Sequence, residues 1–258
     1  MQLISAHPLA RRSSLRSTLV TASVLLGAWS SLQALRLLHS QHRRIDTAAF
    51  SHFEDEAVRR FLIVGDSNGV GIGSVDSRST VPGRLAAAFP GTEVVNQSHD
   101  GADTADIARQ IESSSGRFDL ILIFVGGNDV IRFSRYQTVA EDAVRALDLA
   151  RDRANHVGVV PPADIGTAPV WLWPLGPLYS RRARNVRRVW QIATSERMDV
   201  HLVDLRLARE RDPFRIKPRR YYSPDGIHPS ADGYALWFAQ ITRQVPFFTE
   251  LSHHAELL

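Results

Sequence analysis

The chain carries a short apolar run, FLIV, at residues 61–64, and GDS follows at residues 65–67. A run of apolar residues closed by a glycine is typical of a strand that is buried on both faces. Gly65 predicts an abrupt turn directly after this strand. Ser67 is therefore expected at the carboxyl end of a strand, which is where open α/β sheets bind their ligands.

Other short apolar segments predict four further strands. They cover residues 93–96, 120–125, 157–160 and 200–203, and residues 169–173 are the alternative for the fourth of the five strands. Apolar residues three and four apart predict helices over residues 81–89, 104–112, 139–154, 181–197 and 230–244. Strands that alternate with helices predict a three-layer α/β/α sandwich around a five-stranded parallel sheet.

Length and composition indicate one folded domain. The chain has 258 residues, of which 44% are hydrophobic and 22% are charged, and both fractions are close to globular averages. The absence of cysteine excludes disulfides, thiolate metal sites and a cysteine nucleophile. Lys and Arg (31) nearly balance Asp and Glu (27), so charge gives no indication of nucleic-acid binding.

The N-terminal region has the layout of an export signal. Arg11, Arg12 and Arg16 precede an uncharged stretch over residues 17–35, which is the pattern of a signal peptide or a signal anchor. The stretch is just long enough to cross a bilayer, which takes about 20 residues. Polar residues interrupt it, so a surface amphipathic helix is the alternative. We expect residues 1–45 to form the signal or anchor plus a linker, and residues 46–258 to form an exported domain.

Polar motifs follow the first three predicted strands, and a fourth motif lies near the C-terminus. They are GDSN at residues 65–68, NQSHDGADT at 96–104, GGND at 126–129 and DGIHP at 225–229. Acyl transfer by a serine needs a base that removes the hydroxyl proton and a carboxylate that orients this base. Ser67, His228 and Asp225 are the candidates, because Asp225 lies three residues before His228 and can reach its ring.

The same chemistry needs donors for the developing oxyanion. The candidates are the backbone N–H groups of Ser67 and Gly101 and the side-chain amide of Asn128. These three groups converge if the strands that precede them are neighbours in the sheet. Each motif alone is a common turn sequence; the hypothesis depends on four motifs in this order.

This ordered set resembles the SGNH (GDSL-type) hydrolase superfamily, from about residue 61 to about residue 244. The resemblance implies a flavodoxin-like fold, with Ser67 as nucleophile, Asp225 and His228 as acid and base of the triad, and Gly101 and Asn128 as oxyanion donors beside the Ser67 N–H. Asn68 and Ser98 depart from the pattern, where the family has Leu and often Gly.

The expected function is that of a serine esterase of the cell envelope that needs no cofactor. The resemblance implies esters, thioesters or O-acetylated sugars as substrates, so the partner is a small-molecule, polysaccharide or lipid ester. The protein is expected to be membrane-anchored, periplasmic or secreted. Two alternatives remain open: an acyltransferase that uses the same acyl-enzyme, and a catalytically inactive carbohydrate-binding protein with the same fold.

Other features received weaker interpretations. GVGIG at residues 69–73 does not have the spacing of a dinucleotide-binding loop and predicts a flexible rim beside Ser67. His99 is expected to be a surface hydrogen-bonding residue. No metal site is predicted for His253 and His254, because they lack a carboxylate partner.

Residues 163–179 form the most individual segment. They are rich in Pro and Trp, and they predict either a core strand with a turn or an insertion beside the site. In the second case Trp171 and Trp173, together with Asn68, are candidate substrate-binding residues. The arginines that follow predict a solvated helix face or, as the less ordinary alternative, contacts with anionic lipid or polysaccharide; they are Arg181, Arg182, Arg184, Arg187 and Arg188.

Overall fold

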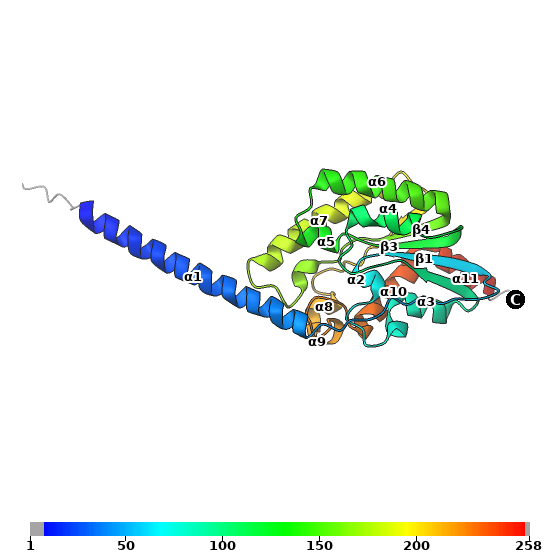
Figure 1. Ribbon diagram of the computed structural model, residues 1–258, viewed down its shortest axis with the longest axis horizontal. Helices are drawn as coiled ribbons and strands as arrows, with labels where there is room; N and C mark the ends of the chain where they lie inside the picture. The colour runs from blue at the N-terminus through cyan, green and yellow to red at the C-terminus, as the bar shows by residue number, and fades with distance from the viewer. Residues whose placement is uncertain (1–7, 256–258) are drawn as a thin grey trace, which may run out of the picture.

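The fold is a parallel sheet with helices on both faces (Figure 1). It is known from a computed structural model that describes residues 8–255 and the side chains of residues 18–251. The strands are β1 (Arg59–Gly65), β2 (Thr92–Asn96), β3 (Phe118–Phe124), β4 (Ala154–Val160) and β5 (Val200–Leu202). Their order is β2-β1-β3-β4-β5, with every pair parallel. This order is that of the flavodoxin-like sandwich, so the predicted fold class is confirmed.

The central parts of β1 and β3 are apolar without interruption because both faces of the sheet are buried there. Leu62 and Val64 point into one core, under α4 (Thr104–Glu112), α6 (Tyr136–Arg153) and α7 (Leu175–Thr194). Phe61 and Ile63 point into the other core, under α3 (Val81–Ala88), α10 (Ala231–Gln244) and α11 (Pro246–Ala255). Apart from the long helix α1 (Pro8–His42), the remaining helices are short. They are α2 (Ser67–Val70), α5 (Gly127–Ile131), α8 (Pro213–Ile216), α9 (Pro218–Tyr221) and the 3-10 turns η1 (Ser77–Ser79) and η2 (Ile165–Thr167).

The sequence offered residues 157–160 or residues 169–173 as the fourth strand, and the structure decides between them. Residues 169–173 form no strand, so the fourth strand is β4, as the stretch at residues 157–160 predicts. Helix α7 begins at Leu175, six residues before the predicted start. Pro177 lies in its first turn, where a helix tolerates proline because that N–H has no intrahelical partner. Residues 163–179 are therefore a loop that contains the 3-10 turn η2 and ends in the first residues of α7.

Helix α1 (Pro8–His42) extends away from the sandwich (Figure 1). Its Thr18–His42 part is long and apolar enough to cross a membrane, by length and composition only, and a signal sequence passes the same test. The residues that follow the helix contact the sandwich: His52 forms an antiparallel bridge with Val94, and Gly73 N–H donates to the Ile45 carbonyl.

Candidate active site

Ser67 lies in the turn between β1 and α2. Gly65 has φ of 143°, and a Cβ at this position would lie 2.1 Å from the Phe124 carbonyl oxygen, so no larger residue fits there. The side chain of Gln110 holds both backbone groups of Gly65, with Gly65 N–H donating over 2.6 Å and Gln110 Nε2 donating to the Gly65 carbonyl over 3.0 Å. The turn thereby fixes Ser67 as the first residue of α2.

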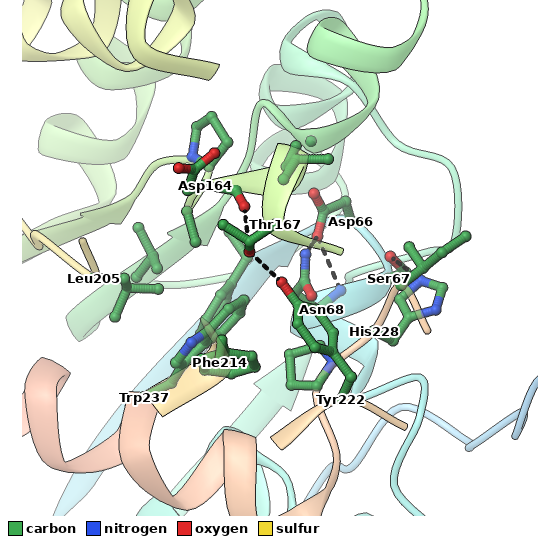
Figure 2. Close-up of a pocket in the computed structure, with 18 of the residues that line it drawn as sticks. Asp66, Ser67, Asn68, Asp164, Thr167, Leu205, Phe214, Tyr222, His228 and Trp237 are labelled. Carbon is green, nitrogen blue, oxygen red and sulfur yellow. Dashed lines mark hydrogen bonds between the residues drawn. The ribbon is translucent and has the colours of Figure 1, made fainter. Parts of the chain in front are cut away.

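The structure brings Ser67, His228 and Asp225 together. His228 Nε2 lies 3.0 Å from Ser67 Oγ, and His228 Nδ1 lies 2.6 Å from Asp225 Oδ2. Figure 2 shows the Ser67 and His228 side chains next to each other on one side of a pocket. This continuous hydrogen-bonded line from hydroxyl to imidazole to carboxylate is the geometry that activates a serine nucleophile.

The carboxylate of Asp225 is buried and surrounded by donors. Its Oδ1 accepts from Ser223 Oγ over 2.7 Å and from the backbone N–H groups of Ile227 and His228 over 2.8 and 3.0 Å. Burial by itself raises the pKa of Asp225, but the hydrogen bond and charge of His228 and the other donors outweigh it and lower the pKa to about 2. Asp225 is therefore ionised at neutral pH. Ser223 was not identified from the sequence.

Two of the three predicted oxyanion donors have free N–H groups. Among the described residues, the backbone N–H groups of Ser67 and Gly101 have no acceptor at hydrogen-bonding distance. Asn128 Nδ2 donates to the Ala102 carbonyl over 2.8 Å, which leaves its second hydrogen for another acceptor. Ser67 and Asn128 line the same cavity, and Gly101 lies next to Asp100, which also lines it.

This cavity has a volume of about 300 Å³ and runs from Ser67 to an apolar wall. In Figure 2, Asp66, Ser67 and His228 lie on one side, and Leu205, Phe214 and Trp237 lie across from them. The wall also contains a hydrogen-bonded pair, Thr167 Oγ1 and Tyr222 OH, 2.5 Å apart. Gln41 and Arg44, from the end of α1 and the linker, line the cavity as well. None of these wall residues carries a motif, so sequence reasoning missed them.

A second buried carboxylate, Asp66, lies next to the nucleophile. Its Oδ1 accepts from the backbone N–H and the side-chain amide of Asn68, both over 2.9 Å. These bonds do not compensate for full burial, so burial raises the pKa of Asp66 from 3.8 to about 6. Asp66 caps the N-terminus of α2 and makes no hydrogen bond to His228 in the described structure.

The three candidate substrate-binding residues lie in different surroundings. Asn68 lines the cavity. Trp171 and Trp173 do not: Trp171 packs on Tyr179 with ring centroids 4.5 Å apart and donates its Nε1–H to the Ile165 carbonyl. Trp173 is 79% exposed and lies outside the cavity.

The expectation of a flexible glycine rim at residues 69–73 is wrong. Gly69, Gly71 and Gly73 are buried, and a Cβ at each would lie within 2.5 Å of another residue's heavy atom. At Gly73 that atom is the Pro229 carbonyl oxygen, one residue beyond His228. The glycines permit close packing between the nucleophile turn and the histidine loop.

The remaining candidates lie outside the cavity. His99 is exposed, with Nδ1 3.3 Å from the Asp100 carbonyl. Arg182 and Arg187 pack against neighbours, Arg182 over the Phe133 ring and Arg187 in an ion pair with Asp204. The other three arginines of this helix, Arg181, Arg184 and Arg188, are solvent-exposed. His253 and His254 lie outside the residues whose side chains are described, and the described side chains contain no group of three His, Asp or Glu that could hold a metal.

A flavodoxin-like sandwich with these polar groups at the carboxyl edge of its sheet has the architecture of an SGNH hydrolase. Residues 63–236 match the GDSL-like lipase/acylhydrolase family, and the chain belongs to this family. The protein is accordingly a carboxylic ester hydrolase by family. Among curated proteins, none matches the chain.

Solved structures share the fold at low sequence identity. A lipolytic protein of the G-D-S-L family from Veillonella parvula is 17% identical, with a TM-score of 0.55 over 70% of this chain and 94% of the other. Axe2, an acetylxylan esterase from Geobacillus stearothermophilus, is 19% identical as a catalytic mutant, with a TM-score of 0.55 over 74% and 96%. LAE5, an α/β hydrolase from a lake metagenome, is 18% identical, with a TM-score of 0.56 over 76% and 98%.

Proposed function

We propose that the protein is a serine esterase in which Ser67 attacks the ester carbonyl. His228 Nε2 takes the Ser67 proton and later gives it to the leaving alcohol, while Asp225 orients the ring and stabilises the imidazolium. A water molecule then attacks the acyl carbonyl while His228 takes a proton from it. The bond from this carbon to Ser67 Oγ breaks, His228 returns the proton to Ser67 Oγ, and the carboxylic acid leaves. The observation that carries this proposal is the Ser67–His228–Asp225 line, with spacings of 3.0 and 2.6 Å.

The oxyanion formed in each step is assigned to three donors. They are the N–H groups of Ser67 and Gly101 and the second hydrogen of Asn128 Nδ2. The two N–H groups without an acceptor support this assignment, because free, preorganised donors stabilise a developing negative charge. Three matched structures are catalytic mutants of Axe2 in which a serine, an aspartate or a histidine is replaced by alanine, which supports the same triad types here.

The substrate is proposed to be an O-acyl ester of a small molecule, a carbohydrate or a lipid. The apolar wall of Leu205, Phe214 and Trp237 suits the acyl group or an apolar part of the alcohol. Transfer of the acyl group to another alcohol uses the same acyl-enzyme and is the second candidate. An inactive carbohydrate-binding protein is disfavoured, because the hydrogen-bonded line to Ser67 is complete.

Replacement of the nucleophile tests the proposal. Ser67→Ala is expected to abolish p-nitrophenyl acetate hydrolysis and labelling by a fluorophosphonate probe, because Ser67 is the only hydroxyl among the described side chains that hydrogen-bonds to the His228 ring. The matched control is Ser195→Ala, because the Ser195 hydroxyl is exposed and donates to the Ile192 carbonyl. This variant should keep full activity. Substantial hydrolysis by a folded Ser67→Ala protein would remove Ser67 from this role.

Asn128→Ala tests the oxyanion assignment. Loss of one such donor lowers kcat by about 10²–10³-fold, with a small change in KM, because the donor acts on the transition state. Thermal melts of the variant control for the loss of the hydrogen bond to Ala102. A near-wild-type kcat would show that Asn128 only holds the neighbouring loop.

A further inference from the structure

An apolar loop outside the active-site cavity lies exposed beside α1. We call residues 169–178 the Trp173 loop. Trp173 is 79% exposed and Leu178 is 40% exposed, and Pro174 and Pro177 between them are exposed as well. Adjacent exposed apolar side chains of this size mark a surface that meets a partner.

Helix α1 holds the Trp173 loop by its backbone. Four hydrogen bonds join them: Trp29 Nε1 to the Trp173 carbonyl (2.8 Å), Arg36 to the Pro169 carbonyl (2.8 Å), Gln33 Nε2 to the Val170 carbonyl (3.3 Å) and Leu172 N–H to Gln33 Oε1 (2.9 Å). Gln33 is only 6% exposed although it belongs to a helix that projects from the sandwich. The loop and this stretch of α1 therefore form one surface.

Some of the loop's backbone groups are also paired with neighbouring residues of the sandwich. Besides the bonds to α1, Leu175 N–H donates to the Leu172 carbonyl and Trp171 N–H donates to the Ala168 carbonyl. Water can satisfy the backbone of an ordinary exposed loop. Internal pairing becomes a requirement where water is absent, as in the apolar part of a bilayer.

The contact point on α1 identifies the partner. Trp29 and Gln33 belong to the part of α1 that is long and apolar enough to cross a membrane, and Leu25, Leu32 and Leu35 around them are exposed. Trp29 and Gln33 lie in the C-terminal half of the uncharged stretch at residues 17–35, and Arg36 follows this stretch directly. The loop therefore lies at the level where the span leaves the lipid. Tryptophan is enriched at this membrane–water interface.

We infer that α1 is retained as an anchor and that the Trp173 loop docks into the lipid–water interface of the bilayer that α1 crosses. Docking buries Trp173, Pro174 and Leu178 in lipid. It also fixes how the sandwich sits on the membrane, since the loop and α1 form two adjoining contacts. Gln41 and Arg44 connect this surface to the active-site cavity, which places the cavity close to the membrane.

The absence of cysteine permits a direct test on the full-length chain. Trp173→Cys is labelled with the environment-sensitive fluorophore NBD, and the protein is reconstituted in vesicles of phosphatidylcholine and phosphatidylglycerol. The matched control is Met198→Cys, because Met198 is 96% exposed. It precedes β5 and so lies at the amino ends of the parallel strands, whereas the Trp173 loop follows the carboxyl end of β4. Leu178→Cys serves as a second reporter in case the first variant fails to fold.

The expected result is a blue-shifted emission at position 173 that nitroxide-labelled lipid quenches and aqueous iodide does not. The label at position 198 should show the opposite behaviour. Iodide quenching at positions 173 and 178 as strong as at position 198 would overturn the inference, and so would a mature chain whose mass lacks α1. Fluorescence does not depend on ester hydrolysis, so this outcome is separate from the test of Ser67.

Discussion

Two buried carboxylates flank the nucleophile, and burial has opposite net outcomes at the two. Asp225 accepts four hydrogen bonds. The donors are the Ser223 hydroxyl, the Ile227 backbone N–H, and the backbone N–H and ring Nδ1 of His228. The pKa of Asp225 is lowered to about 2. Asp66 accepts two, both from Asn68 and both on one oxygen, and its pKa is raised to about 6. The number and charge of the donors decide the sign, because burial alone raises both.

The difference in pKa suits Asp225 to the role of triad acid and Asp66 to the role of helix cap. A triad acid must stay ionised while the neighbouring imidazole gains a proton, and only Asp225 has the donors for this. Asp66 instead caps α2 and lies 3.2 Å from where a Cβ of Gly127 would be, in the packed turn behind Ser67. Three predictions test this division.

Asp225→Asn is expected to have the largest effect. An amide at this position leaves the imidazole in the wrong tautomer, and the same change in a Ser-His-Asp triad lowers kcat by about 10⁴-fold. The measurement is steady-state hydrolysis of p-nitrophenyl acetate near pH 7. A loss of less than tenfold would mean that Asp225 does not serve as the triad acid.

Asp66→Asn is expected to change the pH dependence of stability more than the activity, because asparagine keeps the helix cap but does not titrate. The raised pKa of Asp66 means that its contribution to the free energy of unfolding is fully present below about pH 4 and is lost as the pH rises through about 6. The loss amounts to about 3 kcal/mol in order of magnitude, from a pKa change of about two units. Urea titrations at pH 4 to 7 should show this part of the slope in the wild type and not in Asp66→Asn.

The control for that experiment is Asp225→Asn. The lowered pKa of Asp225 stabilises the fold above about pH 4, and the contribution is lost as the pH falls through about 2. This variant should therefore keep the wild-type slope between pH 4 and 7. Identical slopes for Asp66→Asn and the wild type would show that Asp66 does not titrate in this range.

Ser223→Ala is expected to have the smallest effect of the three. It removes one of four donors to Asp225, and a hydrogen bond to a charged group contributes about 1.5–3 kcal/mol. The three remaining donors keep Asp225 ionised at neutral pH, so we expect kcat to fall by much less than in Asp225→Asn while the free energy of unfolding decreases. An unchanged free energy of unfolding would contradict the assigned bond, and Ser195→Ala again serves as the exposed control.

The sheet and the motif residues were open to prediction because their signals are local. Residues 61–64 and 120–125 are apolar without interruption because both faces of a parallel strand are buried. Asp225 and His228 are three residues apart, so their contact needs only a short turn. The meeting of Ser67 with His228 across 161 positions follows from the strand order, which the motif order implied.

The start of α7 and the role of the glycines at residues 69–73 were harder to predict from the sequence. The apolar spacing predicted a helix from residue 181, whereas α7 begins at Leu175 and has Pro177 in its first turn, where proline fits a helix. The glycines at positions 69, 71 and 73 predicted a flexible backbone. They instead allow Ser98, Thr80 and Pro229, respectively, to pack closely against the turn. In both cases the residue type permits two structures, and packing selects one.

The sequence by itself determined the fold class and the residues that meet Ser67, because hydrophobic periodicity and short motifs depend on neighbours along the chain. Only the tertiary structure decided the cavity wall of Leu205, Phe214 and Trp237, the burial that sets the pKa of Asp66, and the pairing of Gln33 with the Trp173 loop. These features join segments as far apart as 139 positions. Distance in space and exclusion of water decide them, and neither leaves a periodic signal in the sequence.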